Sequence, residues 1–319
     1  MYKKKLLLIL TGPTAVGKTA LSIGLAKALN GEIISADSMQ VYRHMDIGTA
    51  KIKKEQMQGI PHYLIDEYEP FEEFNVAIFQ ARCKEYIDEI HKKGKLPILV
   101  GGTGFYIQSV LYSVNFEETE ADNTYRTELT AYAKEHGAAA LHEKLVLVDK
   151  ESAETIHPNN VKRVIRALEY YKQTGKKISE HNKEQHSKEP AYYFRYYALT
   201  LPREVLYERI NQRVDSMREE GLAEEVKKLL AMGCNREMVS MQGLGYKEIL
   251  SALEGEDTIE HAFEQIKQET RHFAKRQFTW FKRERDVTWI DKGQFQNEEE
   301  LLAYCIQDWQ MHMQDVFGN

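Results

Sequence analysis

The sequence predicts an α/β protein, in which a parallel β-sheet is flanked by helices and carries a mostly helical insertion domain. Two observations favour this fold class. Short apolar runs alternate with helical periodicity over the first hundred residues. A glycine-rich loop then joins the first apolar run to the first helical segment. Because the composition changes after about residue 115, we expect a catalytic core of residues 1–115 and 191–319, with a helical C-terminal part, and an insertion of residues 116–190.

The individual elements follow from apolar spacing and from glycine and proline boundaries. We expect strands at residues 5–10, 32–35, 96–100, 192–199 and 288–290. We expect core helices at residues 19–29, 75–93, 202–217, 222–232, 247–254 and 258–283. Residues 117–152 are acidic and helix-forming, and residues 176–190 are polar, so both segments belong to the insertion.

The loop between the first strand and the first helix fits the phosphate-binding pattern G-x-x-x-x-G-K-[ST]. Its residues are Gly12, Pro13, Thr14, Ala15, Val16, Gly17, Lys18 and Thr19. The core is therefore expected to be P-loop NTPase-like, with backbone N–H groups directed at one anion. Lys18 adds a positive charge, and the Thr19 hydroxyl can ligate Mg²⁺ or contact a phosphate oxygen. The motif predicts a phosphate group but does not identify the molecule that carries it.

Two further segments follow predicted strands, at the edge where parallel sheets bind ligands. Asp37 comes directly after the second strand, and Thr103 lies in the glycine-rich turn 101–104 after the third. Asp37 has two candidate chemical roles, which are to hold Mg²⁺ through water or to accept a proton from a nucleophile. A structural alternative is a helix cap, for which Ser38 is the better candidate of the two.

Charge and composition limit the class of protein. The 319 residues carry a net charge of −6, and no stretch approaches the roughly 20 apolar residues that span a membrane. The three cysteines are far apart in the sequence, which argues against a disulfide framework or structural zinc and favours a reducing cytoplasm. We expect a monomer.

Basic residues are nevertheless concentrated in two segments. Residues 271–285 contain six Lys or Arg and one acid, Glu284, interleaved with aromatic residues. A second group consists of Lys162, Arg163 and Arg166. Basic groups contact phosphates and aromatic rings stack on bases, so the two segments together indicate RNA. A solvated helix face is the alternative interpretation for either segment taken alone.

Six motifs, taken in order, resemble the bacterial tRNA dimethylallyltransferase family, also called isopentenyl-tRNA transferases. The motifs are GPTAVGKT, DSMQVY, GGTGFY, RVIRALE, GLGYKE and KRQFTWF, and the match extends from residue 5 to about residue 290. The resemblance implies transfer of the dimethylallyl group of dimethylallyl diphosphate to N6 of an adenine. That adenine lies immediately 3′ of the anticodon in tRNAs that read codons beginning with U. The implied partners are the tRNA anticodon stem-loop and dimethylallyl diphosphate, and the implied cofactor is Mg²⁺.

The resemblance also implies roles for individual residues. Asp37, Lys18 and Thr19 are catalytic, and Thr19 is the expected Mg²⁺ ligand, with Asp37 as a second candidate. The loop of residues 12–19 holds the diphosphate with Arg209, for which Arg213 is the alternative. The residues implied in tRNA binding are Asp37, Ser38, Met39, Gln40, Thr103, Arg126, Lys162, Arg163, Arg166, Gln242, Gly243, Gly245, Tyr246, Lys247, Lys275, Arg276, Gln277, Trp280 and Lys282.

Two other hypotheses account for part of the sequence. A P-loop kinase acting on a small molecule or nucleotide explains the loop and Asp37 equally well, but not residues 271–285 or the insertion. An RNA-binding module with a relict P-loop explains the basic segments, but the intact Lys18, Thr19 and Asp37 argue against lost chemistry.

Overall fold

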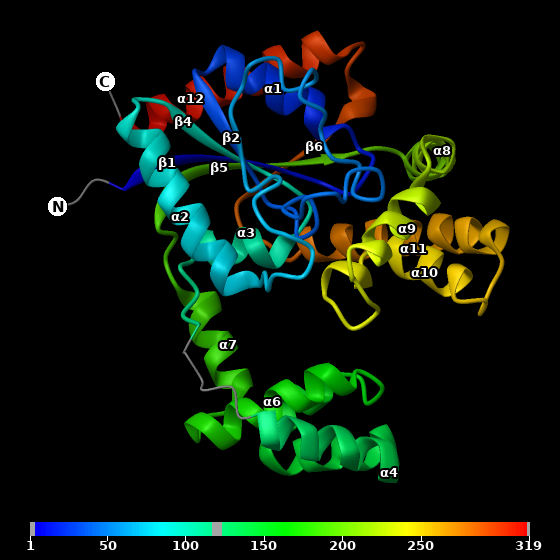
Figure 1. The fold of residues 1–319 in the computed structure, drawn as a ribbon. Helices are drawn as coiled ribbons and strands as arrows, with labels where there is room; N and C mark the ends of the chain where they lie inside the picture. The colour runs from blue at the N-terminus through cyan, green and yellow to red at the C-terminus, as the bar shows by residue number, and fades with distance from the viewer. Residues whose placement is uncertain (1–3, 117–122, 318–319) are drawn as a thin grey trace. The chain divides into compact units, whose positions relative to one another are not determined.

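The sheet of the core is parallel throughout, which confirms the predicted fold class. The computed structural model describes residues 4–116 and 123–317. The strands are β1 (Lys5–Thr11), β2 (Gly31–Ser35), β3 (His62–Tyr63), β4 (Leu96–Val100), β5 (Tyr192–Thr200) and β6 (Val287–Asp291). Their order across the sheet is β3-β2-β4-β1-β5-β6 (Figure 1). The five predicted strands are all present, and β3 is an addition.

The position of β1 in the interior of the sheet explains why its sequence is uniformly apolar. Leu8 lies opposite Ile98 of β4 and Arg195 of β5, so both edges of β1 are paired. Leu7, Leu8, Ile9 and Leu10 are all fully buried. Helices cover both faces of the sheet, with α1 and α12 together on one face and α2 and α3 on the other (Figure 1). A strand covered on both faces has no polar side to present.

The helices of the core bring the C-terminal half of the chain to the carboxyl edge of the sheet. Their bounds are α1 (Lys18–Ala28), α2 (Val76–Lys92), α3 (Gly104–Leu111), α8 (Arg203–Glu220), α9 (Leu222–Ala231), α10 (Tyr246–Leu253), α11 (Ile259–Phe281) and α12 (Glu298–Phe317). Two short 3₁₀ turns are η1 (Ser240–Gln242) and η2 (Lys292–Gln294). Helices α3 and α12 were not predicted from the sequence, whereas the long helix α11 was.

The chain divides into two compact units, of which the second is residues 112–190. Its helices are α4 (Asn123–Val148), α5 (Lys150–Thr155), α6 (Val161–Thr174) and α7 (Ile178–Ser187). Buried Leu129, Leu141, Leu145 and Leu168 form its own apolar core. The predicted insertion begins four residues later, at 116, and residues 117–122 of the acidic segment lie outside the described residues.

The first unit consists of residues 1–111 and 191–319, so the chain leaves it and returns to it. The two points of exit and return are adjacent, because the N–H of Ala191 donates a hydrogen bond to the carbonyl oxygen of Leu111 at 2.8 Å. Over the part of the chain that the structure describes, none of the helices has both the length and the apolar character that crossing a bilayer requires.

Candidate active site

The P-loop turns sharply between β1 and α1. Gly12 has φ 138°, Gly17 has φ 95°, and Ala15 between them has φ 63°. A Cβ built on Gly12 would lie 2.6 Å from the carbonyl oxygen of Leu199, so only glycine allows β5 to approach so closely. Gly17 is the N-cap of α1, and the loop therefore presents the N-terminal end of that helix to a ligand.

Lys18 is held inside the loop by backbone carbonyl groups. Its Nζ donates hydrogen bonds to the carbonyl oxygens of Gly12 and Pro13, each at 2.9 Å. Burial and, to a lesser extent, the positive charge of Arg213 lower the pKa of Lys18 to about 7, while the negative charge of Asp37 acts in the opposite direction. The electrostatic repulsion between Lys18 and Arg213 is relieved when an anion binds between them. The arrangement is therefore that of an anion-binding site.

Asp37 follows β2 and caps the turn that comes after it. Its Oδ1 accepts hydrogen bonds from the N–H groups of Met39 at 2.9 Å and Gln40 at 3.3 Å. The sequence-based assignment of the cap to Ser38 is therefore wrong, because the carboxylate performs that role. Both bonds use the same oxygen, so Oδ2 is left to accept a proton. Capping and proton transfer are thus compatible functions of one side chain.

A cavity of about 370 Å³ brings the three predicted strand-end segments together. Thr14 of the P-loop, Asp37 after β2 and Thr103 after β4 all line it. Arg213 of α8 also lines it, and the Arg213 Nη1 lies 3.5 Å from the hydroxyl oxygen of Thr14. Phosphate-binding, proton-accepting and hydroxyl groups are therefore combined in one cavity.

Apolar side chains line the same cavity between its polar groups. They include Met39, Val214, Met217, Leu244, Ile266 and Phe273. Among them, only Met39 was predicted from the sequence, as a residue that contacts tRNA. The others come from helices α8 and α11 and from the loop before α10, and no local spacing pattern links those segments. The cavity can therefore accept a hydrocarbon group beside a phosphate.

Gln277 connects the P-loop to the glycine-rich turn that follows β4. Its Oε1 accepts the N–H of Thr14 at 2.9 Å, and its Nε2 donates to the carbonyl oxygen of Gly102, also at 2.9 Å. A Cβ on Gly102 would lie 2.2 Å from that Nε2, which explains the glycine. Gln277 was predicted to bind tRNA, but its side chain is buried and both of its ends are engaged, so it holds the cavity wall instead.

The two arginine candidates for the diphosphate clamp occupy different places. Arg213 lines the cavity and lies next to Thr14, and burial lowers its pKa. Arg209, the first candidate from the sequence, is exposed and lies beside Gly17, and it does not line this cavity. The geometry therefore favours Arg213, the alternative, as the clamp inside the cavity.

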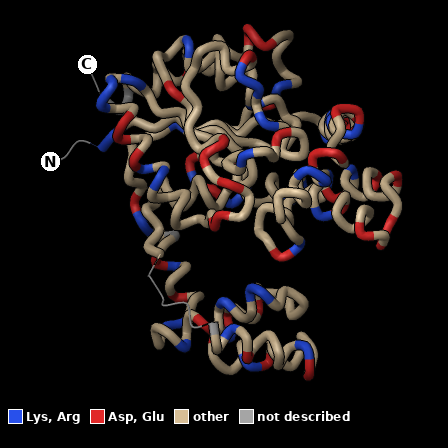
Figure 2. The backbone as a smooth tube through the Cα atoms, viewed as in Figure 1, with Lys and Arg blue, Asp and Glu red and all other residues tan. Residues whose placement is uncertain are grey.

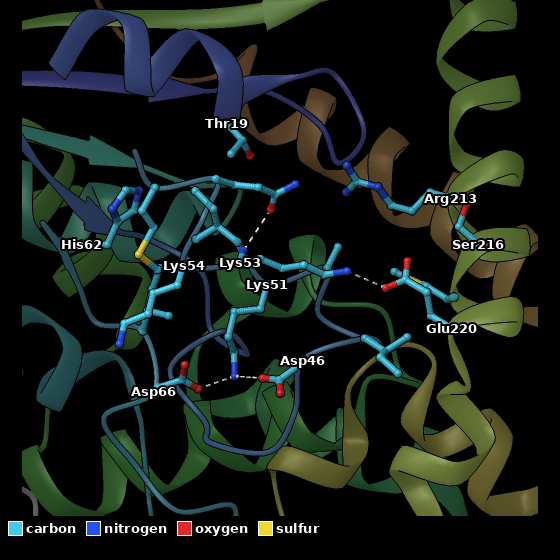
Figure 3. Close-up of a pocket in the computed structure, with 17 residues that line it drawn as sticks. Thr19, Asp46, Lys51, Lys53, Lys54, His62, Asp66, Arg213, Ser216 and Glu220 are labelled. Atoms are coloured by element: carbon cyan, nitrogen blue, oxygen red, sulfur yellow. Dashed lines mark hydrogen bonds and ion pairs between the residues drawn. The ribbon is translucent and has the colours of Figure 1, made fainter. Parts of the chain in front are cut away.

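A second and larger cavity, of about 950 Å³, lies on the Thr19 side of the P-loop (Figure 3). It shares Ala50, Arg213 and Met217 with the first cavity. Figure 3 shows Arg213 directed towards this cavity, below Thr19. The buried Lys51 forms part of its wall and bonds both Asp46 and Asp66, so its charge is compensated. Arg213 is thus exposed to ligands on two sides.

The loop of residues 46–50 separates the two cavities and is anchored by Glu225 of α9. The Glu225 carboxylate accepts the N–H groups of Asp46, Ile47 and Gly48 at 2.9, 2.8 and 3.2 Å. It also accepts the hydroxyl of Tyr246 at 2.6 Å. Glu225 was not predicted from the sequence, because a buried acid on a helix carries no local signal of such a role.

Tyr246 was predicted to contact tRNA, and the structure contradicts this. The side chain is fully buried, and its ring packs so closely on Gly48 that a Cβ there would lie 2.5 Å from it. The neighbouring glycines have related structural roles. Gly243 leaves room for Met39, and Gly245 has φ 93° before α10. Gln242 and Lys247 are exposed at the cavity, where a ligand can reach them.

Of the three residues after Asp37 that were predicted to bind tRNA, two line the cavity and one is held by a hydrogen bond to the backbone. Ser38 and Met39 line the cavity, whereas the Gln40 side chain donates to the carbonyl oxygen of Thr49 at 3.2 Å. Gln40 does not appear among the residues that line this cavity.

Three of the basic residues predicted to bind tRNA lie near the C-terminal end of α11 and in its C-cap. Lys275, Arg276 and Lys282 are exposed, and Arg276 also lines the smaller cavity. The Lys282 ammonium lies 4.6 Å from the centre of the Phe278 ring. Trp280 packs against Gly104, where a Cβ would lie 2.2 Å from the indole ring. Figure 2 shows Lys and Arg interspersed with Asp and Glu along the whole chain, so the local sequence rather than the net charge marks this surface.

The basic residues of the second unit that were predicted to bind tRNA differ in whether their charge is already paired within the protein. Lys162, Arg163 and Arg166 are exposed on α6, and their spacing places them on one side of that helix. Arg126 instead forms a two-bond ion pair with Glu169, at 2.8 and 2.9 Å. The guanidinium of Arg126 must give up or share that carboxylate before it can contact a phosphate, which weakens its predicted role.

The donor set around Thr19 fits Mg²⁺ only when a ligand contributes oxygens. Within the described parts of the chain, no group of three or more His, Cys, Asp or Glu residues could hold a metal ion. Mg²⁺ commonly keeps several waters and binds one or two carboxylates together with substrate phosphates. The Thr19 hydroxyl and the Asp37 carboxylate are suited to that mode of binding and not to a closed protein cage.

Comparisons with known proteins identify the family of this chain. The family model described as IPP transferase matches residues 40–284. A tRNA dimethylallyltransferase of Lachnoclostridium phytofermentans is 57% identical over 300 residues, which are 94% of this chain and 96% of that protein. A protein of the same name from Acetivibrio thermocellus is 53% identical over 295 residues, which cover 92% and 94% of the two chains.

Solved structures show the same similarity. A full-length tRNA isopentenylpyrophosphate transferase from Bacillus halodurans is 46% identical, with a TM-score of 0.72 over 99% of this chain and 100% of that one. A eukaryotic dimethylallyltransferase, described as acting on tRNA, is 32% identical with a TM-score of 0.73 over 90% of this chain and 74% of that one. On this evidence the chain belongs to the IPP transferase family.

Proposed function

We propose that this protein is a tRNA dimethylallyltransferase, which moves the dimethylallyl group of dimethylallyl diphosphate to N6 of an adenine beside the tRNA anticodon. The single observation that carries the proposal is the smaller cavity. It joins a phosphate-binding loop to a carboxylate across an apolar wall, and its rim includes the exposed Gln242, Lys247 and Arg276. The names of the relatives and solved structures support the same activity.

The proposed reaction exchanges one bond to carbon for another. The allylic C1–O bond breaks, and the electron pair leaves with the diphosphate. The adenine N6 forms the new bond to C1, and Asp37 takes the proton that N6 loses. Negative charge grows on the leaving group during this step, and Lys18, Arg213 and the loop N–H groups are placed to stabilise it.

Mg²⁺ is the proposed cofactor. When bound, it supplies positive charge to the diphosphate oxygens and so makes diphosphate a better leaving group. Thr19 is the residue that would hold Mg²⁺. Asp37 is the second candidate, because its negative charge is close enough to the P-loop to raise the pKa of Lys18, the residue before Thr19.

The tRNA is proposed to enter at the side of Asp37 and the loop before α10. An adenine stacked in an anticodon loop cannot reach a cavity, so the base must leave the stack at a cost of a few kcal/mol. The exposed Lys275 and Lys282 are suited to phosphate contacts that hold the RNA during this step. Activity on tRNA favours a cytoplasmic location, and the monomer stays a prediction from the sequence.

The experiment that tests this function omits ATP. The purified protein is mixed with labelled dimethylallyl diphosphate, unmodified tRNA and Mg²⁺. We expect one diphosphate released for each adenine modified, with ATP acting at most as a weak competitor. The kinase alternative is not favoured, because the relatives and solved structures are named as tRNA prenyltransferases. Obligatory cleavage of ATP to ADP without modified adenine would overturn the proposal.

A further inference from the structure

Lys292 lies at the P-loop although it is distant from it in the sequence. The residue follows directly after β6 and begins the turn η2, in which the Asp291 carboxylate accepts the N–H of Gly293 at 2.9 Å. Asp291 is paired with Thr200 at the end of β5. Because all strands are parallel, Lys292 leaves the sheet at its carboxyl edge, the same edge that carries the P-loop.

The ammonium group of Lys292 lies against Gly17. A Cβ built on Gly17 would lie 2.6 Å from the Lys292 Nζ and 3.9 Å from the Nη1 of Arg209. Two cations from distant segments therefore meet at one glycine, which is the N-cap of α1. Gly17 also immediately precedes Lys18, the lysine of the phosphate-binding pattern.

This position is electrostatically unfavourable for a cation unless an anion is also present. The N-terminal end of a helix carries a partial positive charge and favours anions. The Lys292 side chain is 6% exposed, so it is also largely removed from water. Its partner in the structure is Glu298, the first residue of α12, with the Nζ and Oε1 atoms 2.6 Å apart.

The Glu298 pair alone does not explain why the ammonium is buried at this place. The Glu298 side chain is 55% exposed, so an ion pair between these residues could form further out in water. Burying an ammonium group beside another cation costs free energy unless an anion compensates its charge. An anion bound in the P-loop would provide that compensation.

We propose that Lys292 is a second lysine of the diphosphate site. In the free protein Glu298 holds its ammonium beside Gly17, and on substrate binding the ammonium bonds to a diphosphate oxygen. Lys292 then shares with Lys18 the negative charge that develops on the leaving group. This inference rests on the proposed function, because it assigns the anion of the loop as diphosphate.

The test compares three variants of the full-length protein. Lys292→Gln removes the cation, and Glu298→Gln keeps the cation but removes its partner. Lys227→Gln is the matched control, because Lys227 forms an exposed pair with Glu224 of the same 2.6 Å length on α9. Binding of inorganic diphosphate in the presence of Mg²⁺ is measured by calorimetry, together with the thermal midpoint of each variant.

We expect Lys292→Gln to weaken diphosphate binding by about 10-fold, the typical loss for one charge-assisted hydrogen bond. Glu298→Gln should tighten it by about 3-fold, because the carboxylate no longer competes for the ammonium. The control should bind as the parent does. In the transfer assay, Lys292→Gln should raise the KM for dimethylallyl diphosphate and lower kcat, with the KM for tRNA unchanged.

A purely structural ion pair gives a different result. Lys292→Gln and Glu298→Gln would then lower the thermal midpoint alike and leave the diphosphate affinity of both within 2-fold of the parent, which overturns the proposal. If Lys292→Gln does not fold, an unchanged affinity of Glu298→Gln overturns it equally. Failure of the parent protein to modify tRNA would contradict the proposed function, whereas the role of Lys292 is measured by diphosphate binding itself.

Discussion

Gln277 accepts a hydrogen bond from the backbone N–H of Thr14 at 2.9 Å, although the two residues are 263 positions apart in the chain. The same side chain bonds the turn after β4, so α11 fixes the distance between the phosphate-binding loop and the opposite wall of the cavity. The helix that carries the basic residues proposed for tRNA thereby also sets the geometry of the diphosphate site.

Replacing Gln277 with Leu should therefore damage both stability and activity. The change leaves two backbone groups without partners, and each unpaired buried group costs roughly 1–3 kcal/mol. We expect the free energy of unfolding in urea to fall by about 2–5 kcal/mol, and the KM for dimethylallyl diphosphate to rise. Gln277→Glu is the control, because it keeps the oxygen that accepts the Thr14 N–H. Equal effects of the two changes would argue against the bridge.

Replacing Asp37 with Asn tests proton transfer separately from capping. The amide oxygen still accepts the N–H groups of Met39 and Gln40, so the turn should persist. Transfer to tRNA should slow by about 10²–10⁴-fold, measured under single-turnover conditions, while the Kd for tRNA stays within a few-fold of the parent. Asp37→Ala should slow transfer equally and also reduce stability. Turnover of Asp37→Asn close to the parent rate would show that Asp37 serves only as the cap.

The lowered pKa of Lys18 predicts a pH-dependent stability. The pKa is about 7 in the folded protein against 10.5 as the ordinary value, so between these pH values the unfolded chain binds the extra proton. The stability contribution of Lys18 therefore rises with pH across this window, and below pH 7 its burial cost is fully present. Lys18→Met should be more stable than the parent at pH 7, and the difference should shrink towards pH 10.

The measurement is urea unfolding of both proteins at pH 7 and pH 9.5. Lys27→Met, on the exposed side of the same helix, controls for the general effect of removing a positive charge. A stability difference between the parent and Lys18→Met that stays constant with pH would contradict the lowered pKa. Added diphosphate should stabilise the parent and have much less effect on Lys18→Met.

The basic residues of α11 predict a salt dependence of tRNA binding. Substituting Lys275 or Lys282 with Gln should reduce the slope of log K against log salt by about one unit for each lost phosphate contact. The KM for dimethylallyl diphosphate should not change. Arg276→Gln should also lower kcat, because Arg276 lines the cavity. Lys227→Gln on α9 is the control, and an unchanged slope in every variant would mean that these charges are only solvated.

The sheet and the P-loop could be predicted because their causes are local. A buried parallel strand requires a continuous apolar run, and Leu6–Leu10 provides one directly before the glycine loop. Strand β3 is only two residues long, so it has no periodicity to detect. Helix α12 begins with three glutamates after Asn297, a start pattern that the sequence analysis passed over.

The support of the cavity could not be predicted in the same way. Glu225 binds three consecutive N–H groups from a loop about 178 positions earlier, and nothing near Glu225 in the sequence reports that contact. Tyr246 is the opposite case, a structural residue that was predicted to bind tRNA. It belongs to a motif of the family, but its burial shows that the motif includes structural residues as well as residues that can contact a ligand.

The hydrogen bond between Ala191 and Leu111 has a consequence for how this protein can be shortened. Because the chain leaves the first unit and re-enters it at adjacent points, the 79 residues of the second unit close a loop whose ends already touch. Joining Leu111 to Ala191 through a few glycines should therefore leave α3 and β5 in place. The shortened protein should still bind inorganic diphosphate, measured by calorimetry, and lose affinity for tRNA. Such an outcome would mean that the diphosphate site folds without the second unit, and that the second unit adds affinity for RNA to a site that is already complete for phosphate.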